Sequence, residues 1–261
     1  MTLALGMENV DTSIGWGLVI AASLLVGAVA AVTLRLPARL AAVITAFGGG
    51  ILFAAIALEL VPEADRQAGT ASVAFGLLAG TLIYVGVDWW LTRDELMKRA
   101  RRSGHAAAAG RPMKPPARHD ETARGEAITA GIFVDGVPES IALGLTIAQG
   151  ELGVALLAGI LLGNVVEAYG AAQPILAGSH RPGFVLRLLG GIGLALAAAT
   201  VVGGTVLAEA SPGLVGTAEA VAAGAVLAVV SIAIVPYAFV EVSSRVATAT
   251  VLGFVAGYLL S

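Results

Sequence analysis

The sequence predicts an all-α polytopic membrane protein, and three observations support that prediction. Hydrophobic residues make up 57% of the 261-residue chain, whereas charged residues make up only 13%. This charged share is about half of that in an ordinary soluble domain. Apolar runs of about 20 residues recur, and each is long enough to cross a hydrocarbon core of about 30 Å as a helix. These runs are apolar throughout rather than alternating, which favours helices over a barrel.

Eight apolar segments are expected to cross the membrane within one transmembrane domain, residues 1–261. A helix pairs its own backbone groups inside lipid, and the many Gly and Ala residues allow helices to pack closely. Only the short segment EVSSR separates the last two spans. The expected spans are 14–34, 38–61, 71–92, 127–148, 152–177, 184–208, 215–239 and 243–260.

The distribution of Lys and Arg predicts how these spans are oriented. Linkers after odd-numbered spans, together with the first residues of the spans that follow them, hold nearly all of the basic residues, including Arg35, Arg181 and Arg245. Linkers after even-numbered spans hold only Arg66 between them. Because Lys and Arg mark cytoplasmic loops, the odd-span linkers are expected to be cytoplasmic and both termini extracytoplasmic. The expected location is a cytoplasmic (inner) or plasma membrane.

One linker, residues 93–126, differs from the others in length and composition. It is basic and rich in Pro, Gly and Ala, which predicts a flexible cytoplasmic loop. His105 and His119 lie in this linker. Two interpretations of these histidines stay open, namely weak metal contacts and ordinary solvated loop residues.

The chain also contains segments that resemble one another. GILFAAIALELVP (50–62) and GAVLAVVSIAIVP (224–236) share the same spacing from Gly to Pro. VDGVPES (134–140) and GNVVEAY (163–169) form a weaker pair. These pairs predict a 3+2+3 arrangement, in which spans 1–3 and 6–8 are inverted repeats around a central pair, spans 4 and 5. Inverted repeats of this kind are common in transporters, with the site near the middle of the membrane.

A group of polar residues is expected near the middle of spans four and five. Asp135 and Glu139 share one helix face, and Asn164 and Glu167 share another. A rise of 1.5 Å per residue places them about 13–22 Å into the membrane. The sequence places no Lys or Arg at this depth, because Arg39, Arg187 and Arg245 lie among the first few residues of their expected spans, so these carboxylates must bind protons or cations.

An alternative for this group is that the acids stay protonated and only form hydrogen bonds between helices. The cation interpretation is favoured because three carboxylates at one depth are costly for packing alone. Oxygen ligands suit hard divalent ions, and carboxylates also bind zinc. The proline between the two acids of span four, Pro138, removes a backbone donor and frees carbonyl oxygens nearby. Glu59 and Glu63, near the outer end of span two, are expected at the entrance to this site.

These residues resemble a known family, the ZIP (Zrt-, Irt-like protein) metal transporters. The strongest stretches are VPESIALG (137–144) and ELVPEA (59–64), and the similarity extends over nearly the whole chain. The resemblance implies eight transmembrane helices, extracytoplasmic termini and a long cytoplasmic loop after the third helix. It also implies a binuclear metal site between the fourth and fifth helices.

Carried over by position, the family's shared ligands are Glu139 and Glu167, and Asn164 matches a further ligand. Asp135 stands where the family usually has His, and Gly136 and Gly163 stand where it has ligands. Glu59 likewise stands where many members have His. The site implied for this chain is therefore poorer in nitrogen, which favours harder ions such as Mn²⁺, Fe²⁺ or Mg²⁺ over zinc.

The expected function is transport of a divalent metal cation (zinc, or a similar ion such as Mn, Fe or Cd) toward the cytoplasm. The ion is the substrate, and no organic cofactor is expected. The expected partners are this cation and the lipid bilayer, with a homodimer left open and no nucleic acid. A membrane sensor of the same fold that binds metal without moving it is the first alternative. An intramembrane enzyme is a weaker one, because HExxH is absent and the second acid of a protease dyad would have to be a glutamate.

Overall fold

The computed structural model describes residues 2–34, 36–91, 118–150, 153–177, 181–207 and 210–261, and within these ranges every regular element is a helix. The all-α fold predicted from composition is therefore confirmed. The elements are α1 (Thr2–Thr33), α2 (Ala38–Ala55), η1 (Ile56–Leu60), α3 (Val61–Ala68), α4 (Thr70–Leu91), α6 (Arg118–Ala148), α7 (Val154–Ala177), α8 (Pro182–Val202), η2 (Gly203–Leu207), α9 (Pro212–Val229), η3 (Val230–Ile234), α10 (Val235–Val242) and α11 (Arg245–Leu260).

Seven helical segments in the described ranges are long and apolar enough to cross a membrane. They correspond to the first seven expected spans, with ends that differ by a few residues. The eighth, α11, has 16 residues. At 1.5 Å per residue it reaches about 24 Å, which is shorter than a typical hydrocarbon core. The chain thus has seven to eight long apolar helices, as an integral membrane protein does.

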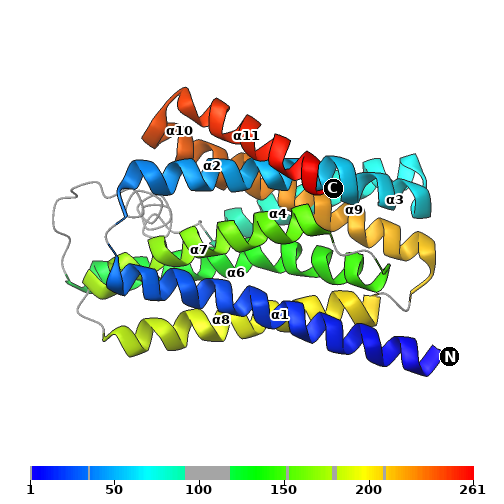
Figure 1. Cartoon of the computed structure of the whole chain (residues 1–261), viewed down its shortest axis with the longest axis horizontal. Coiled ribbons are helices and arrows are strands. Elements are labelled where there is room, and N and C mark those ends of the chain that lie inside the picture. Colours follow the sequence, from blue (N-terminus) through cyan, green and yellow to red (C-terminus); the bar gives the residue numbers. More distant parts are fainter. Residues whose placement is uncertain (1, 35, 92–117, 151–152, 178–180, 208–209) are drawn as a thin grey trace.

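The helices form one bundle with α6 and α7 in its middle, and both chain ends lie at the same end of it (Figure 1). The central helices α6 and α7 contact each other. Around them the contacts occur in matched pairs: α7 packs against α1 and α2, and α6 packs against α8 and α9. Likewise α11 packs on α2 as α4 packs on α9, while α1 packs on α8. This set of contacts is unchanged when four pairs of helices are exchanged: α1 with α8, α2 with α9, α4 with α11, and α6 with α7.

The similar segments 50–62 and 224–236 each begin at a glycine, and both glycines make the same kind of contact with a neighbouring helix. A Cβ atom on Gly50 of α2 would overlap the carbonyl oxygen of Thr250 on α11. A Cβ atom on Gly224 of α9 would overlap the carbonyl oxygen of Leu77 on α4. Each glycine therefore lets two helix backbones meet directly, which is how helices associate in the absence of a hydrophobic driving force.

The same two segments also share a widened helical turn at the same register. The π-helical turns η1 and η3 each end two residues before a proline, Pro62 and Pro236. A proline ring clashes with the carbonyl of the residue four positions earlier and donates no hydrogen bond. A π-helical turn widens the helix at that point, which relieves the clash and lets the helix continue. The shared Gly-to-Pro spacing therefore produces the same local backbone twice.

Two expected boundaries are wrong. The linker predicted to be loop over 93–126 is helical from Arg118 onward, because RHDETARGE is rich in good helix formers once Pro115 and Pro116 are passed. The remainder, 93–117, lies outside the described residues. The second span, expected to end at 61, continues to Ala68 because η1 carries the helix past Pro62. By contrast, Pro138 lies inside an uninterrupted α6.

The backbones of α4 and α9 meet at Gly80, so a larger residue there is expected to lower the stability of the protein. A Cβ atom on Gly80 would overlap the carbonyl oxygen of Val221, so Gly80→Ala forces the two helices apart. We expect a loss of about 1–3 kcal/mol in the free energy of unfolding, as for other overpacked contacts. Gly86→Ala, on the same helix, has no atom within 4 Å of the new methyl group. It should be neutral or slightly stabilising because Ala favours helix over Gly. Thermal unfolding in detergent measures both variants, and equal midpoints would contradict the prediction.

Candidate functional site

Asp135 lies on α6 in the interior of the bundle and is only 5% exposed. The hydroxyl group of Tyr84, on α4, donates a hydrogen bond to its Oδ1 atom. Tyr84 is itself 2% exposed, so this contact is shielded from solvent and lipid. Burial of a carboxylate is tolerated only when hydrogen bonds or charges compensate it, and this phenol is one such partner. Sequence reasoning missed Tyr84, because a single tyrosine in an apolar span carries no pattern.

Glu139 lies one turn further along α6, and it is 6% exposed. It is the ninth of the 18 residues in its span, and Asn164 is the eleventh of 20 in the facing span on α7. Both therefore occupy the middle of the bundle, as predicted. Asn164 is 2% exposed, whereas Glu167 on the same helix is half-buried.

Two buried polar atoms, one on each of α6 and α7, have no hydrogen-bond partner among the described residues. They are Nδ2 of Asn164 and Oγ of Ser140, which directly follows Glu139. Ser140 is fully buried. Buried polar groups in native proteins are nearly always hydrogen-bonded, so such atoms call for a water molecule or an ion nearby. An amide has an oxygen and a nitrogen at equivalent positions, so rotation of the Asn164 amide would offer an oxygen ligand at the same place.

The predicted carboxylates do not converge into one tight cluster in this conformation. Among the residues that the structure describes, no group of three or more His, Cys, Asp or Glu side chains is placed so as to hold a metal ion. Asp135, Glu139 and Glu167 lie on the two central helices without sharing one coordination sphere. Their role as joint ligands stays a prediction.

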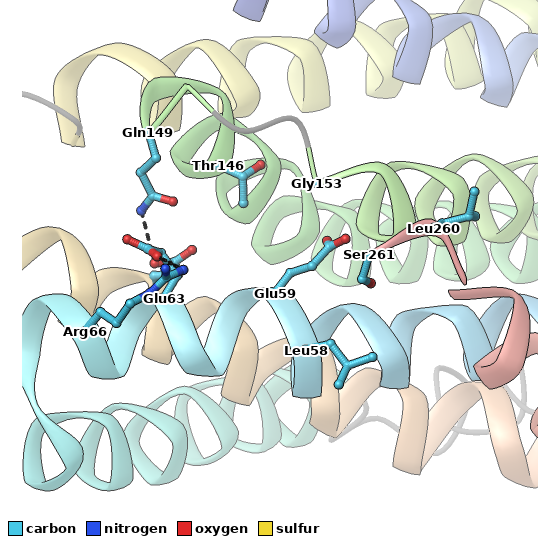
Figure 2. Close-up of a pocket in the computed structure, with 10 residues that line it drawn as sticks. Leu58, Glu59, Glu63, Arg66, Thr146, Gln149, Gly153, Leu260 and Ser261 are labelled. Atoms are coloured by element: carbon cyan, nitrogen blue, oxygen red, sulfur yellow. Dashed lines mark hydrogen bonds and ion pairs between the residues drawn. The ribbon is translucent and has the colours of Figure 1, made fainter. Parts of the chain in front are cut away.

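A second polar region is a cavity of about 150 Å³ at the end of the bundle that holds the C-terminus (Figure 2). Its walls come from η1, α3, the end of α6, the start of α7, α9 and the end of α11. Polar side chains predominate among them. The lining residues are Leu58, Glu59, Glu63, Arg66, Thr146, Gln149, Gly153, Glu219, Leu260 and Ser261. The two predicted entrance acids, Glu59 and Glu63, thus lie in one cavity.

Glu59 extends toward the start of α7 (Figure 2), where the backbone N–H of Ala155 donates to its Oε1 atom at 3.4 Å. The start of a helix has unpaired N–H groups and a positive partial charge, so a carboxylate is stabilised there. Gly153 leaves room for this arrangement, since a Cβ atom on it would lie 2.9 Å from Oε2 of Glu59. Glu59 therefore links the second span to the fifth.

Glu63 has partners on its own helix. It forms an ion pair with Arg66, and its Oε1 atom accepts a hydrogen bond from Gln67 at 2.6 Å. Its charge is therefore partly compensated.

Glu219, on α9, is a functional candidate that the sequence interpretation missed. It is fully buried, and its Oε2 atom accepts a hydrogen bond from Nε2 of Gln149 at 3.1 Å. Its Oε1 atom has no hydrogen-bond partner among the described residues. A signal was available, because Glu219 is a carboxylate inside an apolar span, as Glu139 is.

The predicted loop histidines are separated from both regions in the chain. His105 lies outside the described residues, and His119 lies in the first turn of α6. The proposal of weak metal contacts there stays open.

Comparison of the chain with models of known protein families finds no match, and comparison with curated proteins finds none either.

Proposed function

We propose that this chain transports a divalent metal cation across a membrane, toward the cytoplasm. One observation supports this most directly: Glu139 and Asn164 are buried at mid-depth on the two central helices, and Asp135 is buried one turn from Glu139. Placing a charged group at this depth costs roughly 2.5–3.5 kcal/mol, so such residues mark ion pathways far more often than packing. Transport accounts for the cost, whereas a purely structural bundle would be more stable with apolar residues at the same positions.

The surroundings of this region favour a cation. Within the described spans, Arg39, Arg66 and Arg187 each lie in the first or last two turns. None of them therefore shares the depth of Glu139. A positively charged substrate is the group that would balance carboxylates there. The side chains concerned offer oxygen, and the described chain has no cysteine, so hard ions such as Mn²⁺, Fe²⁺ or Mg²⁺ are favoured over softer ones.

The proposed mechanism uses two three-span units that move relative to α6 and α7. The exchange symmetry of the helix contacts and the paired turns η1 and η3 support an inverted repeat. Rocking of repeats around a fixed mid-membrane site is a common form of alternating access. The ion would enter through the cavity lined by Glu59 and Glu63, bind near Glu139 and Glu167, and leave at the opposite end.

Membership of the ZIP family is part of this proposal. It rests on the Pro138–Glu139 pair in the fourth span, Asn164 and Glu167 in the fifth, and the segment ELVPEA. The departures at Asp135 and Gly163 distinguish this chain from the family pattern.

Uptake by purified protein in proteoliposomes tests the proposal. An internal fluorescent chelator would report entry of Mn²⁺, Fe²⁺, Zn²⁺ and Cd²⁺ added outside. We expect saturable uptake of at least one of these ions above the level of protein-free vesicles. Saturable binding without uptake would favour the alternative of a membrane sensor. Neither binding nor uptake of any ion would contradict both.

A further inference from the structure

We infer that the cavity lined by Glu219 is a second cation site, and that it takes a divalent ion that keeps several of its water ligands. Glu219, Gln149 and Glu59 are the residues that would hold it. This site is distinct from the mid-membrane residues Glu139 and Glu167, and it would exist whether or not the chain moves the ion.

The first support is that Glu219 is a buried carboxylate with one oxygen that lacks a hydrogen-bond partner. This carboxylate is fully buried, lies on the wall of the cavity, and has Gln149 on only one of its two oxygens. The other oxygen, Oε1, has no hydrogen-bond partner in the described part of the chain. A buried carboxylate oxygen without a donor is costly, and a cation is the group that compensates it best.

The second support is that the fold does not require carboxylates at these positions. Alignment of the two resembling segments on Gly50 and Gly224 pairs Glu59 with Ala233 and Glu219 with Thr45. The equivalent positions in the other half thus lack both acids, although the helices there pack in the same way. Packing alone therefore does not explain why this end of the bundle concentrates acidic residues.

The kind of ion follows from the number of ligands and the space. No three acidic side chains of the described residues are placed to enclose a metal directly. Glu63 is occupied by Arg66, which leaves Glu219 and Glu59 as the acids that face the ion. The cavity of about 150 Å³ has room for several water molecules, at about 30 Å³ each. An ion bound by one or two carboxylates that retains its waters is typical of Mg²⁺ and similar hard ions.

The test uses Mn²⁺ as a probe and the full chain in detergent or nanodiscs. The double variant Glu139→Gln/Glu167→Gln first removes two of the three carboxylates of the mid-membrane site and leaves Asp135, which accepts a hydrogen bond from Tyr84. Electron paramagnetic resonance then counts bound Mn²⁺, and water-proton relaxation reports its remaining water ligands. We expect one Mn²⁺ per chain with several coordinated waters. In that background, Glu219→Gln should weaken binding at least tenfold, which corresponds to about 1.4 kcal/mol.

Glu63→Gln is the matched control, because it removes the same charge from the same cavity but from a residue paired with Arg66. It should weaken binding by less than about threefold, as expected for a partly exposed ion pair. If Glu219→Gln does not fold, Glu59→Gln is the variant that tests the site. The amide oxygen of the new glutamine still accepts a hydrogen bond from the N–H of Ala155, while the negative charge is lost. This variant should weaken binding severalfold.

Three results would overturn the inference: no Mn²⁺ bound to the double variant, no effect of Glu219→Gln, or equal effects of Glu219→Gln and Glu63→Gln. Failure of the proposed function is recognised separately. Uptake that persists in the double variant would contradict the mid-membrane transport site without changing the count of Mn²⁺ in the cavity.

Discussion

Replacing Glu139 by Gln is expected to lower metal uptake into proteoliposomes at least tenfold while the protein stays folded. Glutamine has nearly the same volume and keeps one oxygen, so the packing of α6 should change little. What it loses is the charge and the second oxygen, and metal binding needs deprotonated, charged ligands. Even substitutions of groups that only support a ligand typically lower metal affinity 10–100-fold. The loss at a direct ligand should be at least as large.

Glu167→Gln should act in the same direction, because Glu167 occupies the matching position on α7. Asp11→Asn is a suitable control: Asp11 is an exposed acid on α1, remote from both polar regions in the sequence. It should leave uptake unchanged. Wild-type uptake in both Glu139→Gln and Glu167→Gln would refute the assignment of the mid-membrane site.

The features that could be predicted from sequence are those fixed by short stretches of chain. Span positions follow from run length, because a helix needs about 20 apolar residues to cross lipid. The equivalence of Gly50 and Gly224 follows from spacing, because each glycine is followed by a proline twelve residues later in an otherwise apolar segment. The depth of Glu139 and Asn164 follows from counting residues along a straight helix.

Other features depend on contacts between distant segments, and local sequence does not contain them. Nothing near Tyr84 indicates that its hydroxyl meets Asp135, which lies 51 positions away. The role of Glu59 at the start of α7 likewise needs a partner 96 positions away. Glu219 was overlooked for a different reason. It is a single carboxylate in an apolar span with no second acid beside it, although the cost of burying it applies there as it does at Glu139.

Tyr84→Phe is expected to lower the affinity for the transported cation about tenfold, with little change in fold. Phenylalanine preserves the ring that packs in the core and removes only the hydroxyl that donates to Asp135. An unsatisfied buried acceptor costs about 1–3 kcal/mol, and loss of a group that orients a ligand usually lowers metal affinity 10–100-fold. Titration of Mn²⁺ binding to the purified variant measures the affinity, and thermal unfolding measures the fold.

The position of Tyr84 makes this variant informative about mechanism as well as affinity. Its helix, α4, otherwise exposes large apolar side chains such as Phe75 and Leu82, as a lipid-facing helix does. Tyr84 instead reaches inward and joins α4, a member of the first three-span unit, to the central helix α6. A hydrogen bond between α4 and α6 would couple cation binding at Asp135 to movement of the first three-span unit.

A double-mutant cycle separates this coupling from simple packing. If Tyr84 acts through Asp135, then Tyr84→Phe should have almost no effect on affinity in an Asp135→Asn background. Residues in one hydrogen-bonded unit typically show interaction energies of about 0.5–3 kcal/mol, whereas independent sites are additive within about 0.5 kcal/mol. Tyr169→Phe serves as the matched control, because its hydroxyl accepts from the N–H of Leu36, in the linker between α1 and α2. Additive effects of Tyr84→Phe and Asp135→Asn would show that the phenol supports packing and does not position a ligand.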